Sequence, residues 1–133
     1  MRRLATLIID ADADFVMAAG RFLSDFSACE IVGHAATGYE GMVAARRLRP
    51  ELVLVELALP DIDGLELAAR LRQLAPPPAM IGVSALTRAR FGRRSGDEVL
   101  DRYIGKPEFS AAVPRVVDRL IAARDARMLR DAA

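Results

Sequence analysis

Short apolar segments alternate along this chain with longer stretches of helical spacing. The short segments show no alternation of apolar and polar residues, which is typical of strands buried on both faces of a sheet. They cover residues 4–9, 30–35, 52–57, 79–83 and 103–104. The chain therefore predicts five strands, each followed by a helix.

The stretch after the fifth strand shows the clearest helical spacing. Its apolar face consists of Val113, Val116, Val117, Leu120 and Ile121. Ser110 is the expected N-cap of this helix, and Pro114 fits only near its first turn. The fourth stretch is the weakest, because residues 88–100 carry two glycines, four arginines and a thin apolar stripe. We expect a short or mobile helix there.

Five alternations of strand and helix indicate the α/β fold class. Such a (βα)5 chain packs as a doubly wound, five-stranded parallel sheet of flavodoxin-like topology, with helices on both faces. Ligands of these sheets bind at the carboxyl ends of the strands. The residues directly after each apolar segment are therefore the candidates for function.

Length, charge and cysteine usage limit the function classes. The 133 residues, 53% of them hydrophobic, suffice for one domain, which we place at 1–124, with 125–133 as a C-terminal helical extension or frayed tail. The formal net charge of +1 argues against nucleic acid and membrane surfaces as partners. No stretch is long and apolar enough for a membrane-spanning helix. A single cysteine, Cys29, favours a reducing cytoplasm.

The basic residues are unevenly divided between the two cationic types. Of 19 basic residues only Lys106 is a lysine, and all the others are arginine. A compact ammonium and a planar guanidinium are not interchangeable. The position of Lys106, directly after the fifth apolar segment, makes it a candidate for a specific role.

Polar residues follow four of the predicted strands. Asp10 and Asp12 follow the first strand, Glu56 lies in the third, Ser84 ends the fourth and Lys106 follows the fifth. Because these strand ends can converge at one edge, we expect an acidic cluster together with a hydroxyl and an ammonium. Such a set suits a divalent cation, a phosphoryl group or both.

The order of these residues resembles the receiver domain of response regulators in two-component phosphorelay signalling. Residues 50–66 are similar to the segment that carries the phosphoacceptor of that family, which places Glu56 at the acceptor position. Ser84-Ala85 and Lys106-Pro107 resemble its Thr/Ser-Ala and Lys-Pro motifs, and Tyr103 falls at its switch aromatic. The resemblance covers roughly residues 4–124 and implies a signalling module, not an enzyme.

Two departures from this resemblance alter the expected chemistry. The family has aspartate where this chain has Glu56, and it has a second acid, a direct Mg2+ ligand, where this chain has Ala11. Glutamate moves the carboxylate by about one C–C bond, ~1.5 Å, and alanine cannot bind a metal. We therefore expect phosphorylation to be impaired and Mg2+ binding to be weakened or lost. No metal is expected, and any ion would be held by Asp10 and Glu56.

Two explanations of Glu56 stay open at this point. The longer side chain can imitate the phosphorylated state by pairing with Lys106, or it can be drift in a domain that no longer needs a nucleophile. Asp10 competes for Lys106, while Asp12 suits an N-cap of the first helix better than a ligand position. If Glu56 imitates the phosphorylated state, it must contact Lys106. The presence of this contact in the structure is therefore the first test of that explanation.

The expected partners are signalling proteins, such as a histidine kinase or a downstream regulator. The resemblance implies docking on the face formed by the fourth helix, fifth strand and fifth helix, where a second copy of the chain is the alternative. Arginines 88, 90, 93 and 94 give this face a local positive charge. No output segment follows in the sequence given, so we interpret it as a stand-alone receiver.

Other functions remain as alternatives. The first is a phosphoaccepting single-domain response regulator. The second is a small phosphatase that resembles the haloacid dehalogenases, with Asp10 as nucleophile and Asp12 as acid or base, although a later metal-binding acid pair is missing. Alternating Asp10, Asp12 and Asp14 do not form a calcium loop, because its required glycine and glutamate positions hold Phe15 and Arg21.

Overall fold

A computed structural model describes residues 3–26, 28–85 and 99–132 of the chain. These residues contain five strands and several helices along the chain. The elements are β1 (Leu4–Ile9), α1 (Ala13–Asp25), β2 (Cys29–Ala35), α2 (Gly38–Leu48), β3 (Leu52–Glu56), α3 (Gly64–Leu71), β4 (Ala79–Ser84), β5 (Arg102–Gly105), the 3-10 turn η1 (Lys106–Glu108) and α5 (Phe109–Ala132). All five predicted strands are confirmed, each within two residues of its expected ends.

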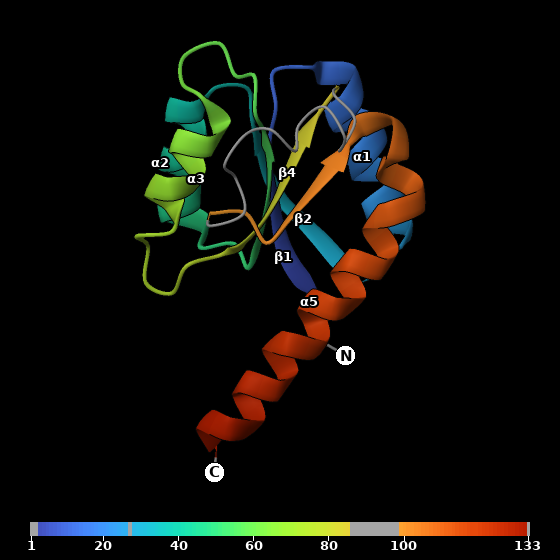
Figure 1. Ribbon diagram of the computed structural model, residues 1–133, viewed down its shortest axis with the longest axis vertical. Coiled ribbons are helices and arrows are strands. Elements are labelled where there is room, and N and C mark those ends of the chain that lie inside the picture. The colour runs from blue at the N-terminus through green and yellow to red at the C-terminus, as the bar shows by residue number, and fades with distance from the viewer. Residues whose placement is uncertain (1–2, 27, 86–98, 133) are drawn as a thin grey trace.

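The five strands form one parallel sheet in the order β2-β1-β3-β4-β5. Helices α2 and α3 cover one face of the sheet, and α1 and α5 cover the other (Figure 1). The order doubles back at β1, so the chain winds in both directions from the first strand. The predicted doubly wound α/β fold is thereby confirmed, and all strands point their carboxyl ends toward the same edge.

Two apolar clusters, one on each face, hold the helices to the sheet. One contains Leu7, Val53 and Met80 beneath the α2 and α3 side, and the other contains Ile8 and Leu54 beneath the α1 and α5 side. Neighbouring strand residues point to opposite faces, so a strand buried on both faces must be apolar throughout. This explains why the strands of this chain show no polar alternation.

The start of the last helix differs from the prediction. The chain forms the η1 turn first, and α5 begins at Phe109, so Ser110 lies inside the helix and is not its N-cap. Pro114 consequently lies in the second turn and not in the first. Pro107 explains the shift, because a proline within the first two positions of η1 favours helical geometry earlier than the apolar stripe suggests.

Helix α5 continues without interruption to Ala132, and its C-terminal part extends away from the sheet (Figure 1). In this extension the side chains of Met128 and Leu129 are exposed. The expected fourth helix, with arginines 88, 90, 93 and 94, lies outside the described residues. Among the residues that are described, no helix is both long and apolar enough to cross a membrane.

Candidate functional site

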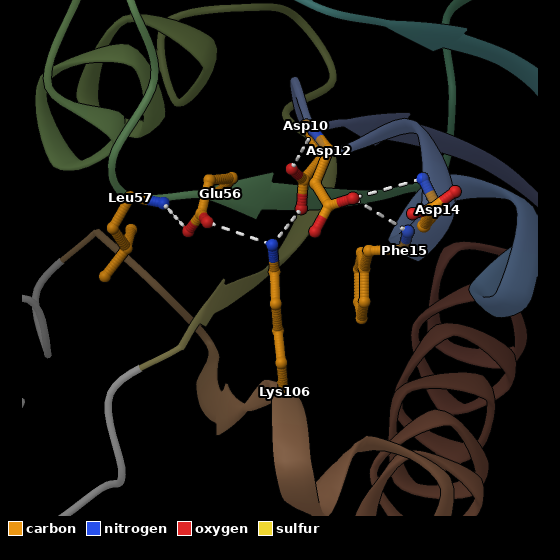
Figure 2. A network of polar contacts seen from close by, with 7 residues as sticks. All are labelled: Asp10, Asp12, Asp14, Phe15, Glu56, Leu57 and Lys106. Carbon is orange, nitrogen blue, oxygen red and sulfur yellow. Dashed lines mark hydrogen bonds and ion pairs between the residues drawn. The ribbon is translucent and has the colours of Figure 1, made fainter.

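Three charged side chains from separate strands meet at the carboxyl edge of the sheet. Asp10 directly follows β1, Glu56 is the last residue of β3, and Lys106 directly follows β5. Figure 2 shows the Lys106 side chain reaching from η1 to a position between the two carboxylates. The parallel sheet therefore brings together residues that are up to 96 positions apart in the sequence.

The Lys106 ammonium forms an ion pair with both acids. Its Nζ lies 2.9 Å from Asp10 Oδ2 and 3.1 Å from Glu56 Oε1. The three side chains are largely withdrawn from solvent, with 16% of Lys106, 2% of Asp10 and 11% of Glu56 exposed. Ion pairs in such surroundings are screened far less than pairs on the surface. The predicted contact between Lys106 and Glu56 is confirmed, and so is the competing contact with Asp10.

Backbone amides fix the other oxygen of each carboxylate. The Leu57 N–H donates to Glu56 Oε2 at 2.7 Å, and the Asp12 N–H donates to Asp10 Oδ1 at 2.9 Å. Asp10 Oδ2 is buried and accepts no hydrogen bond of good geometry from the described residues, so the nearby ammonium is its counter-charge. Each acid thus contacts a backbone N–H with one carboxylate oxygen and Lys106 with the other.

An aromatic ring completes the surroundings of the ammonium. Lys106 Nζ lies 4.5 Å from the centre of the Phe15 ring, within the range of a cation–π contact. Burial by itself would lower the pKa of Lys106, but hydrogen bonds to Asp10 and Glu56 and the charges of both acids outweigh it. The net result is that the pKa of Lys106 is raised above its ordinary value. The ammonium is therefore protonated throughout the physiological pH range.

Asp12 belongs to the first helix and not to the ion-pair cluster. Its carboxylate accepts hydrogen bonds from Asp14 N–H and Phe15 N–H, 3.1 and 3.2 Å away, and so caps α1 (Figure 2). The expected N-cap role is confirmed. Of the two acids proposed for the pocket, only Asp10 contacts Lys106.

Ser84 and Tyr103 lie at the same end of the sheet and are both buried. Ser84 ends β4 and is paired in register with Gly105, the residue before Lys106, while Val83 is paired with Glu56. Tyr103 packs into the apolar cluster on the α2 and α3 face. Ser84 is thus within one strand position of the ion-pair cluster, as its place in the sequence suggested.

The loop that follows Glu56 packs very closely. A Cβ added at Gly64 would lie 2.3 Å from the Glu56 carbonyl oxygen and 2.5 Å from Leu57 Cα, so only glycine fits there. The same loop reaches helix α2, because Asp61 accepts hydrogen bonds from Gly38 N–H and Tyr39 N–H. These two bonds lower the pKa of Asp61 below its ordinary value. The loop is therefore anchored at both ends.

The sequence analysis missed two contributors to this region. Phe15 was not among the predicted site residues, yet its ring contacts Lys106. Asp61 was not singled out, yet it caps α2 from a loop 22 residues away along the chain. An acid two residues before an Asp-Gly pair is the single local signal for Asp61, and no local signal exists for Phe15.

The resemblance to receiver domains implies a Mg2+ ion, and the residues present do not fit one. Mg2+ in proteins is usually bound by one or two carboxylates together with several waters, at roughly 2.0–2.1 Å, whereas one oxygen of each acid here already faces an ammonium. Ala11 offers no side-chain oxygen at the remaining position. In residues 3–26, 28–85 and 99–132, no group of three or more His, Cys, Asp or Glu side chains could hold a metal ion.

Comparison with known proteins agrees with this geometry. The family described as "Response regulator receiver domain" matches residues 6–117, which is most of the chain. The match spans β1 through the first turns of α5 and so includes Asp10, Glu56 and Lys106.

Curated relatives match over part of their length. BvgA of Bordetella pertussis, which is named as a transcription regulator of virulence factors, is 34% identical over 88 residues, covering 66% of this chain and 42% of BvgA. The response regulator VraR of Staphylococcus aureus is 31% identical over 85 residues, covering 64% of this chain and 41% of VraR. The chain thus matches about two fifths of the length of these relatives.

Solved structures show the same fold at lower identity. The receiver domain of AraT from Geobacillus stearothermophilus superposes with a TM-score of 0.82 at 23% identity, covering 96% of this chain and 99% of that one. The response regulator domain of CheB from Thermotoga maritima gives a TM-score of 0.79 at 22% identity, covering 93% and 98%. The α1 and α5 layer and the α2 and α3 layer are therefore a shared architecture.

Proposed function

Since the chain belongs to the response regulator receiver domain family, we propose that it is a receiver module that signals by protein binding without an acyl phosphate on β3. Receiver domains of two-component systems are signalling modules that interact with kinases and effectors. What is specific to this chain in the proposal is its independence of phosphorylation. The observation that carries it is the bridge from Lys106 to both Asp10 and Glu56.

The bridge opposes phosphoryl transfer in two ways. A nucleophilic carboxylate must point an oxygen in line with the donor, and a metal must neutralise the phosphoryl oxygens. In this chain Glu56 Oε1 faces Lys106 and Oε2 accepts from Leu57 N–H, so neither oxygen is directed outward for attack. A misplacement near 1 Å can cost about 100-fold in rate, and the missing acid at Ala11 adds to this loss.

The same bridge favours the hypothesis that Glu56 imitates the phosphorylated state over the hypothesis that Glu56 is neutral drift. Glu56 supplies a permanent negative charge one methylene further from the strand than aspartate would, and Lys106 pairs with it at 3.1 Å. A phosphoryl group carries about −1.5 to −2 charges at neutral pH, so the imitation is partial. The Glu56 charge is present without phosphorylation by a kinase. This permanent charge would hold the domain in the binding state that the phosphorylated form adopts.

Weak Mg2+ binding, absence of catalytic activity and a cytoplasmic location complete the proposal. Weak Mg2+ binding is supported by Asp10, which is already paired with Lys106, and by Ala11, which offers no side-chain oxygen. The location is supported by the single cysteine, Cys29, which is buried and forms no disulfide. A thiol of this kind is suited to a reducing compartment. Docking on the α5 and β5 side remains part of the proposal.

Acetyl phosphate with a Mg2+ titration tests the proposal directly. Three proteins would be compared by Phos-tag mobility and mass mapping: the unaltered chain, Glu56→Asp, and the double variant Ala11→Asp/Glu56→Asp. We expect no Mg2+-dependent modification of the unaltered chain and clear modification of the double variant at position 56. The single variant should lie between them, because it restores the nucleophile but not the metal ligand.

The outcomes separate the alternatives named from the sequence. Stoichiometric, Mg2+-dependent modification of the unaltered chain at Glu56 or a neighbouring aspartate would establish the phosphoaccepting regulator instead. Hydrolysis of p-nitrophenyl phosphate that is lost in Asp10→Asn would establish the phosphatase. The structure already disfavours the second, since Asp12 is committed to capping α1.

A further inference from the structure

A cavity lies at the amino edge of the sheet, opposite the edge that holds the ion-pair cluster. Its volume is about 340 Å³, and its walls come from the end of α2, the loop between α3 and β4, and the C-terminal half of α5. Much of the lining is apolar: Leu4, Ala45, Pro50, Leu74, Ala75, Pro76, Pro77, Pro78, Ala79 and Leu120. Cavities of this size are within the range that binds small organic molecules.

The charged lining of this cavity is strongly one-sided. Four arginines, at positions 46, 49, 124 and 127, line it together with one acid, Glu51. Glu51 is already engaged, because Oε2 lies 3.3 Å from Arg124 Nη1 and Oε1 accepts from Ala5 N–H at 3.1 Å. Arg124 is buried and also contacts Asp125 at 3.3 Å. The acid therefore neutralises the inner arginine and leaves the outer arginines uncompensated.

The other three arginines stand at the solvent side of the cavity. Arg46, Arg49 and Arg127 are exposed and make no ion pair within the described residues. Guanidinium groups bind carboxylate and phosphate through two parallel N–H donors. Three such groups around one apolar cavity form a positive rim, and no acid in the described part of the chain pairs with them.

The backbone at Arg49 is a second, independent observation. Arg49 caps α2 in the left-handed conformation, with φ of 49°, and it is the sole non-glycine residue of the described chain with positive φ. Glycine or asparagine is the usual residue at such a cap, and a larger side chain costs about 1–2 kcal/mol there. A residue that costs local stability but places a guanidinium at a cavity rim indicates use of that side chain.

We propose that this cavity is a binding site for a small organic anion that joins a flat apolar body to a phosphate or carboxylate group. The apolar and proline lining would cover the body, and the guanidinium groups of Arg46, Arg49 and Arg127 would bind the anionic group. The site is on the far side of the sheet from Lys106, so it does not depend on whether position 56 is phosphorylated. It gives the module a ligand input separate from the carboxyl edge.

Isothermal titration calorimetry on the full 133-residue chain tests the site with four probes. Adenosine monophosphate carries a ring and a phosphate, and 2-naphthoate carries a ring and a carboxylate. Adenosine has the ring without the charge, and inorganic phosphate has the charge without the ring. We expect one or both of the first two probes to bind at least about tenfold more tightly than adenosine and phosphate, since each of these lacks one half of the recognised chemistry.

Matched variants locate the binding. Arg49→Asn removes a rim guanidinium while keeping a residue that accepts the left-handed conformation, and Arg127→Gln removes another. Arg47→Gln is the control, because Arg47 is an exposed arginine of α2 that does not line the cavity. Losing a charged hydrogen bond should weaken binding of the organic anion about tenfold or more in the first two variants. The control should bind like the unaltered chain.

Any of four results would overturn the proposal. Equal weakening by Arg47→Gln would show diffuse attraction to a basic surface. Equal affinity for inorganic phosphate and the ring-bearing anions would show that the apolar lining is not used. Absence of binding for both ring-bearing anions at millimolar concentration, or binding of an acidic peptide alone, would also exclude a small-molecule site.

Discussion

The two edges of the sheet differ in whether their charged side chains are paired within the protein. At the carboxyl edge, Asp10, Glu56 and Lys106 compensate one another within a cluster that is largely buried. At the amino edge, Glu51 neutralises Arg124, and the exposed Arg46, Arg49 and Arg127 line the same cavity without an ion pair among the described residues. Both edges belong to one small domain with a single sheet. The difference shows which charges support the fold and which are left for another molecule.

Burial determines how costly each arrangement is to disturb. A buried charge that loses its partner carries most of its desolvation cost uncompensated. An exposed arginine is hydrated and loses little when it has no partner. Substitutions in the carboxyl-edge cluster should therefore change stability, whereas substitutions of the exposed Arg46, Arg49 and Arg127 should change binding with little effect on stability.

The largest effect is expected from Lys106→Met. The neutral side chain keeps the contact with Phe15 but leaves Asp10 and Glu56 facing each other without a cation. We expect the free energy of unfolding, measured in urea near neutral pH, to fall by about 3–5 kcal/mol.

Two controls belong to this experiment. Glu66→Gln breaks the exposed Glu66–Arg70 pair, whose side chains are 58% and 61% exposed, and should cost no more than about 0.5 kcal/mol. The triple variant Asp10→Asn/Glu56→Gln/Lys106→Met removes all three charges and should recover much of the loss. A Lys106→Met loss as small as that of Glu66→Gln would remove the basis of the comparison.

The next effect concerns alkaline pH. Because the pKa of Lys106 is raised in the folded protein, the folded state holds this proton more tightly than the unfolded chain. The resulting stabilisation is fully present below the unfolded lysine pKa, roughly 10.4, and is lost as the pH rises through the folded value. We expect the stability difference between the unaltered chain and Lys106→Met to narrow over the range above about pH 10. A difference that stays constant over this range would contradict the assigned ion pairs.

The smallest effect is expected at the amino edge. Arg127→Gln should change the free energy of unfolding by no more than about 0.5 kcal/mol. Arg49→Asn should leave stability equal or slightly raise it, since asparagine tolerates the left-handed conformation better. Thermal and urea unfolding of both variants would check this. A loss comparable to that of Lys106→Met would mean that these arginines support the fold, and that they are not reserved for a ligand.

The sequence predicted the carboxyl edge far better than the amino edge. Asp10, Glu56 and Lys106 each follow or end an apolar strand, so parallel packing alone brings them to one edge. The amino-edge cavity joins residues near positions 45–51, 74–79 and 120–127, of which none follows a strand in a recognisable order. The start of α5 was also mispredicted, because a 3-10 turn that begins at Lys106 and contains Pro107 precedes the helix, and the apolar spacing does not indicate this turn.

What the sequence determined by itself is the architecture and the membership of the ion-pair cluster. Apolar runs with no polar alternation require burial on both faces, and that requirement leads to a parallel sheet between two helical layers. Only the tertiary structure decided how Lys106 divides its contacts, that Phe15 shields it, and that a cavity opens beneath α5. The reason is that periodicity fixes which face a residue lies on, whereas distances of a few ångström depend on how distant segments pack together.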